Sequence, residues 1–200
     1  FDAYQLAKYR GESNAVKLVD VVRLVRPKPT KKNADALAKL LKGELKNTQT
    51  WEAKISAAGQ QKNSDEQAAA RNEAWADLLK ENKLGYLALV RNLTNIAKDA
   101  DDATFELALK ALVNTDAIKK SLIFPFQLYT AYKEVESNGR IGKANRIAKI
   151  MDALSQALDI SCANVPEMPG KTLVAIDISG SMTSPVSTMN KASCVDIATL

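Results

Sequence analysis

The residues with the clearest chemical potential lie near the carboxyl end of the sequence, where Asp177, Ser179 and Ser181 alternate in the order D-x-S-x-S. In an extended chain, side chains two residues apart point to the same side, so one carboxylate and two hydroxyls would face a common point. These oxygen donors suit Mg²⁺ or Mn²⁺, with the remaining positions filled by water or by a partner's carboxylate or phosphate. We predict a metal site here. The alternative is a serine–glycine turn in which Asp177 caps the next helix.

A second candidate site is a run of basic residues near the amino end. Between positions 17 and 32 the only acidic residue is Asp20, and the first 50 residues carry eleven Lys and Arg against five Asp and Glu. A local excess of cations is typical of a surface that binds the phosphates of a nucleic acid, and it also occurs on an ordinary solvated helix face. Charge alone leaves both interpretations open. We call the following residues the basic stripe: Lys17, Arg23, Arg26, Lys28, Lys31 and Lys32.

The composition excludes several kinds of chemistry. The 200 residues contain no histidine, which removes Ser-His-Asp and Cys-His catalysis and His-ligated zinc from this chain. Cys162 and Cys194 are 32 residues apart, a spacing that fits neither a zinc site nor a disulfide framework. No apolar run approaches the roughly 18 residues of a membrane span. We therefore expect a cytoplasmic protein that is not an enzyme and, because the first residue is Phe, a fragment of a longer chain.

The spacing of apolar residues predicts helices along most of the chain, because such residues recur at helical intervals between short turns. We expect Trp75, Phe105 and Phe126 in the core. About eight consecutive helices with short connections favour an antiparallel HEAT-like array. A compact irregular helical domain is the alternative.

Several polar residues interrupt these helical patterns. Arg91, Asn92 and Asn95 fall in an apolar helix expected over 84–96, where they would be hydrogen-bonded core residues or line an inner surface. A second, weaker basic group is expected on a solvated helix face and consists of Arg140, Lys143 and Arg146.

The character of the sequence changes after residue 162. Two prolines and a glycine within 163–170 indicate a linker. The run Thr172–Ile176 is apolar and rich in β-branched residues, which predicts a strand buried on both faces. Met189, Ala192 and Val195 then mark a helix. A strand, a polar loop and a helix in this order are typical of the start of an α/β domain.

Several segments together resemble known families. The strand that ends in Asp177-Ile-Ser-Gly-Ser-Met182 resembles the first strand and metal-ion-dependent adhesion site (MIDAS) of von Willebrand factor A domains. Earlier segments resemble the TROVE domain of Ro-type ribonucleoproteins, namely Arg23–Pro29, Trp51–Gly59, Lys83–Ile96, Phe124–Phe126 and the join Asn164–Gly170.

The resemblance implies a mainly α fold: part of a TROVE ring of HEAT-like repeats, followed by the first strand and helix of an α/β von Willebrand factor A domain. Residues 1–162 would be the C-terminal part of the TROVE-like repeat domain, 163–170 a linker, and 171–200 the truncated start of the A-like domain. The family's further metal ligands, a threonine and an aspartate, would lie beyond Leu200.

The resemblance also implies a function. The protein would be the RNA-binding scaffold of a ribonucleoprotein, forming a monomeric ring that binds small non-coding (Y-like) or misfolded RNA through the basic stripe. Asp177, Ser179 and Ser181 would hold Mg²⁺ or Mn²⁺, and an acidic protein ligand at that ion is a second expected partner; no membrane is expected. The alternative is a metal-dependent protein–protein interaction module that does not bind RNA.

Overall fold

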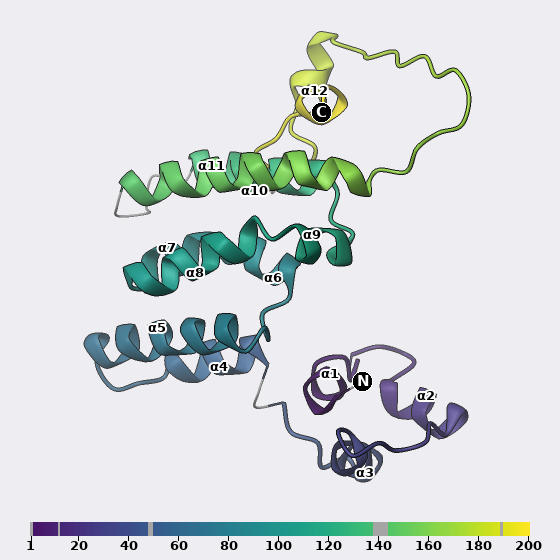
Figure 1. The fold of residues 1–200 in the computed structure, drawn as a ribbon, viewed down its shortest axis with the longest axis vertical. Coiled ribbons are helices and arrows are strands. Elements are labelled where there is room, and N and C mark those ends of the chain that lie inside the picture. Colours follow the sequence, from purple (N-terminus) through teal and green to yellow (C-terminus); the bar gives the residue numbers. More distant parts are fainter. Residues whose placement is uncertain (1, 12, 48–49, 138–143, 189) are drawn as a thin grey trace. The chain divides into compact units, whose positions relative to one another are not determined.

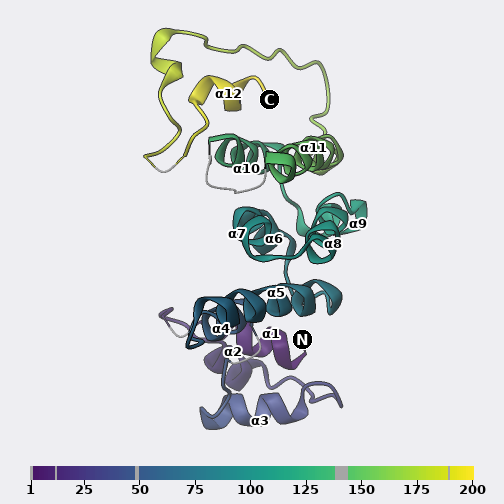
Figure 2. The same ribbon diagram turned by 90° about the vertical axis from the view of Figure 1, so that its left-hand side faces the viewer.

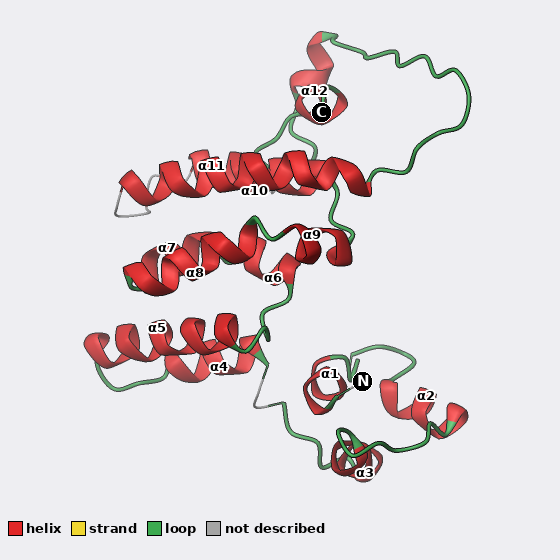
Figure 3. Cartoon of the chain, in the orientation of Figure 1, coloured by secondary structure: helices red, strands yellow, loops and turns green. Residues whose placement is uncertain are grey.

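The computed structural model describes residues 2–11, 13–47, 50–137, 144–188 and 190–200, and most of them are helical (Figures 1 and 3). The mainly α fold predicted from the apolar spacing is confirmed. The chain divides into two compact units, Phe1–Ala70 and Arg71–Leu200, and the boundary lies inside helix α5 (Ser64–Lys80). In the described ranges, no helix combines the length and the apolar character that crossing a bilayer requires.

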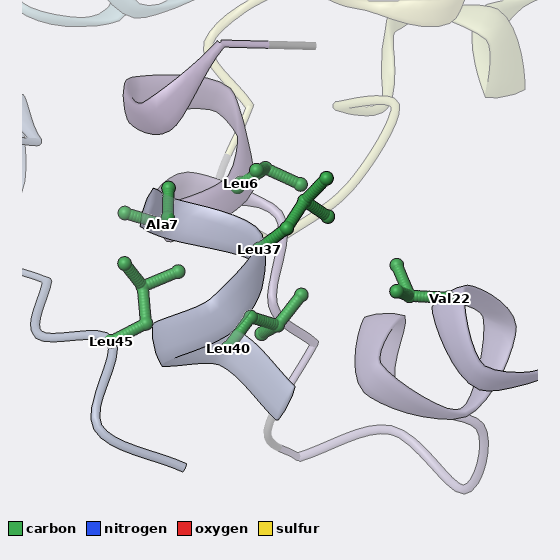
Figure 4. Packing of buried hydrophobic residues seen from close by; sticks show 7 residues of the cluster. Leu6, Ala7, Val22, Leu37, Leu40 and Leu45 are labelled. Carbon is green, nitrogen blue, oxygen red and sulfur yellow. The ribbon is translucent and has the colours of Figure 1, made fainter. Parts of the chain in front are cut away.

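The first unit contains α1 (Ala3–Lys8), α2 (Leu18–Val25), α3 (Ala34–Lys42), α4 (Trp51–Ala58) and the start of α5. The apolar faces of α1, α2 and α3 meet in a small core (Figure 4). Two helices end at glycine: α3 at Gly43, whose φ of 76° favours a residue without a side chain, and α4 at Gly59. The buried members of the core are Leu6, Ala7, Val22, Ala36, Leu37, Leu40 and Leu45.

After the remaining part of α5, the second unit contains two layers of helices. One layer holds α6 (Tyr86–Arg91), α7 (Leu93–Asp99), α8 (Asp102–Leu112) and α9 (Thr115–Ser121). The other is the antiparallel pair α10 (Pro125–Ser137) and α11 (Ala144–Ser161), which lie side by side (Figures 1 and 2). Helix α11 packs on α7, α8 and α9, so the two layers share one core.

The helix predicted over 84–96 is divided in two at Asn92. The Asn92 side chain is buried, and its amide donates to the backbone carbonyl of Ala88 at 2.9 Å. Its Oδ1 accepts a hydrogen bond of 3.0 Å from Asn95. Asparagine side chains compete in this way with the backbone hydrogen bonds of a helix. Asn92 is therefore a hydrogen-bonded core residue, whereas Arg91 is exposed.

The prediction that Arg146 lies on a solvated face is wrong, because its side chain is only 5% exposed. Its guanidinium donates to the carbonyls of Ala97 and Ala100 at 2.7 and 2.8 Å and to the Asp102 carboxylate at 2.5 Å. It also lies 4.7 Å from the centre of the Phe105 ring. These partners offset the cost of burying the charge. Arg140 and Lys143 fall outside the described residues.

Two of the three aromatic residues expected in the core are there. Trp75 and Phe105 are buried, but Phe126 is 46% exposed. The buried face of α10 contains Pro125, Leu128 and Val135, so Phe126, in the first turn, lies off that face. The prediction for Phe126 is therefore wrong.

The strand predicted at Thr172–Ile176 is not confirmed. Residues 171–178 have no regular secondary structure (Figure 3), and Leu173 is 93% exposed. A strand needs a neighbour to satisfy its backbone N–H and C=O groups, and the described residues contain no other strand. The physical reason for the difference is therefore the lack of a pairing partner among these residues.

The last residues form a compact turn on the second unit. After η2 (Gly180–Thr183), Pro185 and Ser193 form an antiparallel bridge, and α12 (Cys194–Ala198) follows. Ala192 is completely buried. The helix predicted around Met189, Ala192 and Val195 therefore begins only at Cys194, and Met189 itself lies outside the described residues.

Candidate functional site

The basic stripe lies on α2 and on the connection from α2 to α3, within the first unit. Lys17 is the residue before α2, Arg23 is in its last turn, and Arg26 follows its end. Lys28, Lys31 and Lys32 lie in the connection that leads to α3. All six side chains are exposed. The structure therefore keeps these cations on one short helix and one loop.

No carboxylate neutralises the basic stripe in the described part of the chain, where none of its six side chains forms an ion pair. The two acids on α2 and α3 have other roles. Asp20 accepts a hydrogen bond of 3.0 Å from the backbone N–H of Lys17 and so caps α2. Asp35 pairs with Lys39 at 2.7 Å, and this hydrogen bond raises the pKa of Lys39.

Arg23 and Arg26 line the same groove beside α2, which has a volume of about 440 Å³. Arg26 adopts a left-handed conformation with φ of 47°, which ends the helix and turns the chain toward Pro27 and Pro29. The floor of the groove is apolar and includes Leu37. Two guanidinium groups at one groove can each bind phosphate oxygens with paired N–H donors.

The second candidate site is the loop from Asp177 to Ser181, where Ser179 is hydrogen-bonded both to the Asp177 carboxylate and to the Ser181 hydroxyl. The backbone N–H of Ser179 donates to Asp177 Oδ1 at 2.8 Å, and the hydroxyl oxygens of Ser179 and Ser181 are 3.1 Å apart. Hydrogen bonds from Ser179, chiefly from its backbone N–H, hold the pKa of Asp177 below its ordinary value. The Asp177 carboxylate is therefore ionised at neutral pH.

This donor set fits a small divalent cation. In octahedral Mg²⁺ coordination with oxygens at about 2.1 Å, adjacent ligands are separated by about 3 Å. The two serine oxygens already have that separation. The described residues contain no group of three or more His, Cys, Asp or Glu that could hold a metal, so the candidate depends on one carboxylate and two hydroxyls.

A third feature was not found by sequence reasoning. A groove of about 740 Å³ in the second unit is lined by side chains of α6, α7 and α10 and by Asn190 and Lys191. Exposed Arg91 and Phe126 are among them. The sequence holds one signal for this exposure: Phe126 directly follows the proline that begins α10, and side chains at a helix end are less enclosed than those in its middle.

Comparison with known proteins assigns most of the helical part of the chain to a family. The TROVE domain family matches residues 44–159. The chain belongs to the TROVE family. The TROVE match extends from the residue after Gly43 to within two residues of the end of α11. The basic stripe precedes it and the Asp177 loop follows it, whereas the 740 Å³ groove lies mostly inside it.

Two curated relatives are named RNA-binding protein RO60. The protein of Caenorhabditis elegans is 32% identical over 118 residues, which are 56% of this chain and 18% of the relative. That of Deinococcus radiodurans is 30% identical over 107 residues, 50% of this chain and 20% of the relative. Telomerase protein component 1 of Mus musculus is 27% identical over 94 residues, 46% of this chain and 3% of the relative. The aligned part of this chain thus spans at most a fifth of each of these relatives. No solved structure matches the chain.

Proposed function

We propose that this chain is part of an RNA-binding scaffold of a ribonucleoprotein. It would bind small non-coding or misfolded RNA through the basic stripe. The observation that carries this proposal is the set of six exposed cations that form no ion pair with described residues and lie one helix before a TROVE segment. Two relatives that align with about half of the chain are named as RNA-binding proteins. The role is one of binding, without a catalytic step.

The physical basis is the release of counterions from RNA phosphates. Each cation that contacts a phosphate contributes roughly one unit to the slope of log affinity against log salt concentration. For each such contact, a tenfold rise in salt concentration therefore weakens binding about eightfold. Contacts of this kind position a folded RNA without reading its sequence. The basic stripe contains no aromatic residue, so base stacking is not part of its proposed role.

The test is filter binding of a synthetic RNA hairpin to the full chain. Arg26→Ala and Lys28→Ala should each weaken binding several-fold. Lys120→Ala removes an exposed cation on α9, far from the basic stripe in sequence, and should leave binding unchanged. If all three variants bind the hairpin as tightly as the original chain, the proposal is wrong.

A second candidate function concerns the metal. We propose that Asp177, Ser179 and Ser181 hold Mg²⁺ or Mn²⁺ in an adhesion-type site at the start of a von Willebrand factor A-like domain. Two observations support this proposal. Hydrogen bonds connect Ser179 to Asp177 and to Ser181, and the pKa of Asp177 is lowered. A bound ion would there offer open positions to a carboxylate of a partner protein. A metal-dependent interaction module without RNA binding is the alternative function, and partner capture that EDTA does not abolish would exclude it.

The wider architecture is also a proposal. Residues 1–162 would be the C-terminal part of a HEAT-like TROVE repeat domain in a monomeric ring, 163–170 a linker and 171–200 the start of the A-like domain. Stacked antiparallel helices in the second unit support the repeat assignment. The proposed location is the cytoplasm, where unbridged thiols such as those of Cys162 and Cys194 are usual.

A further inference from the structure

The groove between α10 and helices α6 and α7 has the lining of a protein-binding surface. Its lining combines polar side chains with aliphatic ones, among them Leu87, Val90, Leu93, Ile123 and Val135. Its volume of about 740 Å³ is large enough to receive several side chains of a ligand. Helices form both walls, so the shape is already defined by the fold of the second unit.

The rim of this groove exposes large apolar side chains that the core does not use. Leu87 and Phe126 line the groove and are 39% and 46% exposed. The Phe124 ring stacks on Phe126, with ring centres 6.2 Å apart, and is also exposed. Contiguous exposed apolar surface of this kind marks an interaction site in a soluble protein.

Leu122 lies in the connection between α9 and α10 and directly precedes Ile123, which lines the groove. It has a left-handed conformation with φ of 53°, where glycine would be unstrained, and it is 69% exposed. A leucine here is unfavourable for the backbone and gains little from burial within the chain. Burial of the Leu122 side chain against a partner would offset both the backbone strain and the exposure of apolar surface.

The charges at the groove are predominantly positive. Arg91 and Lys191 line it and are exposed, and neither forms an ion pair with another described residue. Glu134 is the one carboxylate among the lining residues. An acidic partner is therefore complementary to the rim.

The groove adjoins the surface of α10 on which the C-terminal turn of this chain is packed. The C-terminal turn buries Ala192 completely and contributes Asn190 and Lys191 to the groove wall. The phenol of Tyr129 on α10 donates a hydrogen bond of 3.1 Å to Asp196 of α12. A docked peptide would extend this contact along α10.

We propose that the groove binds an amphipathic helical segment of a partner protein. Apolar side chains at positions i, i+3 or i+4, and i+7 would enter the groove, and acidic side chains would face Arg91 and Lys191. An RNA strand fits less well, because unpaired bases are held by several aromatic rings and Phe126 is the single aromatic residue among the lining residues. The proposal is independent of RNA binding by the basic stripe.

The test is selection from a phage-displayed library of random peptides of about 16 residues, some four helical turns, on the full chain. Counter-selection uses the chain with Leu87→Glu and Phe126→Glu, two exposed positions whose change should leave the fold and its thermal unfolding intact. Selected peptides should carry the apolar spacing and several Asp or Glu. Fluorescence anisotropy of a labelled peptide should show at least tenfold weaker binding to Phe126→Glu and several-fold weaker binding to Arg91→Ala. Lys120→Ala, the matched control, should bind normally.

Three results would overturn the proposal. The first is selected peptides that lack the acidic and apolar pattern, or that bind Phe126→Glu as tightly as the original chain. The second is oligouridylate binding that Phe126→Glu abolishes, since the groove would then hold RNA. The third is a dimer in sedimentation that Phe126→Glu converts to a monomer, since a second copy would then fill the groove. Arg26→Ala and Lys28→Ala should leave peptide binding unchanged, which separates this proposal from the RNA proposal.

Discussion

The Nη1 atom of Arg146 donates a hydrogen bond of 2.7 Å to the backbone carbonyl of Ala97, and this bond joins the first turns of α11 to the end of α7. The same guanidinium also binds the carbonyl of Ala100 and the carboxylate of Asp102. The buried Arg146 side chain thus supplies hydrogen-bond donors to backbone carbonyls at the C-terminal end of α7, which have no partner within the helix.

Replacement of Arg146 by Met is expected to destabilise the chain strongly. The carbonyls of Ala97 and Ala100 would lose their donors, and a buried acceptor left without a partner costs about 1–3 kcal/mol. The free energy of unfolding in urea measures this effect. Arg146→Lys keeps the charge but loses the planar fork, so it should restore only part of the stability.

The control for this prediction is Lys149→Met on the same helix. Lys149 pairs with Glu106 at 2.5 Å, but both side chains are about half exposed. An exposed pair contributes about 0–1 kcal/mol, so this variant should unfold nearly like the original chain. Equal losses in the two variants would show that Arg146 does not act through its buried contacts.

Tyr86 predicts a dependence of stability on alkaline pH. Its hydroxyl donates to the carbonyl of Leu112 at 2.6 Å inside the core, and burial raises the pKa of the phenol well above its usual value. Because folding favours the protonated phenol, its stabilising effect is complete below the unfolded pKa of about 10. It is lost as the pH rises toward the folded pKa.

The measurement is the urea unfolding free energy at neutral and at alkaline pH. Tyr86→Phe should lose about 1 kcal/mol at neutral pH, the usual contribution of one hydrogen bond, and should show a smaller further loss in alkali. Tyr9→Phe, at a 60% exposed position, is the matched control. An alkaline loss of the same size in Tyr86→Phe and in the original chain would contradict the assignment to Tyr86.

The Asp177 loop predicts binding of Mn²⁺ that calorimetry or electron paramagnetic resonance can detect. Asp177→Asn should abolish binding, and Ser179→Ala or Ser181→Ala should weaken it by about tenfold or more. Because the pKa of Asp177 is lowered, the carboxylate stays ionised and affinity should remain constant between neutral pH and about pH 5. Asp116→Asn, which removes an exposed carboxylate on α9, is the control. Equal Mn²⁺ binding by Asp177→Asn and the original chain would exclude this loop as the site.

Local signals in the sequence account for several helix ends. Asp101 caps α8 by accepting a hydrogen bond of 2.7 Å from the Thr104 backbone, and Gly43 and Gly59 are of the residue type that commonly ends a helix. The hydroxyls of Ser179 and Ser181 also lie 3.1 Å apart, although Ser181 is in η2 and not in the extended segment that the alternation assumed. Each of these features depends on residues at most four positions apart, so the sequence contains the needed information.

The differences arise where distant residues decide the outcome. Arg146 looks like a surface residue until acceptors more than 40 positions away surround it. Phe126 has the character of a core residue, but α10 buries a different face. The apolar run at Thr172–Ile176 has strand propensity, and a strand also requires a neighbour to pair with. None of these conditions is visible in a local pattern.

The salt dependence of RNA affinity tests the central claim most directly. Plotting log affinity for an RNA hairpin against log salt gives a slope that counts phosphate contacts. The double variant Arg26→Ala, Lys28→Ala should reduce the magnitude of this slope by about two, and the double control Lys119→Ala, Lys120→Ala should leave it unchanged. A slope that is the same in all three proteins would show that the basic stripe does not contact the RNA backbone.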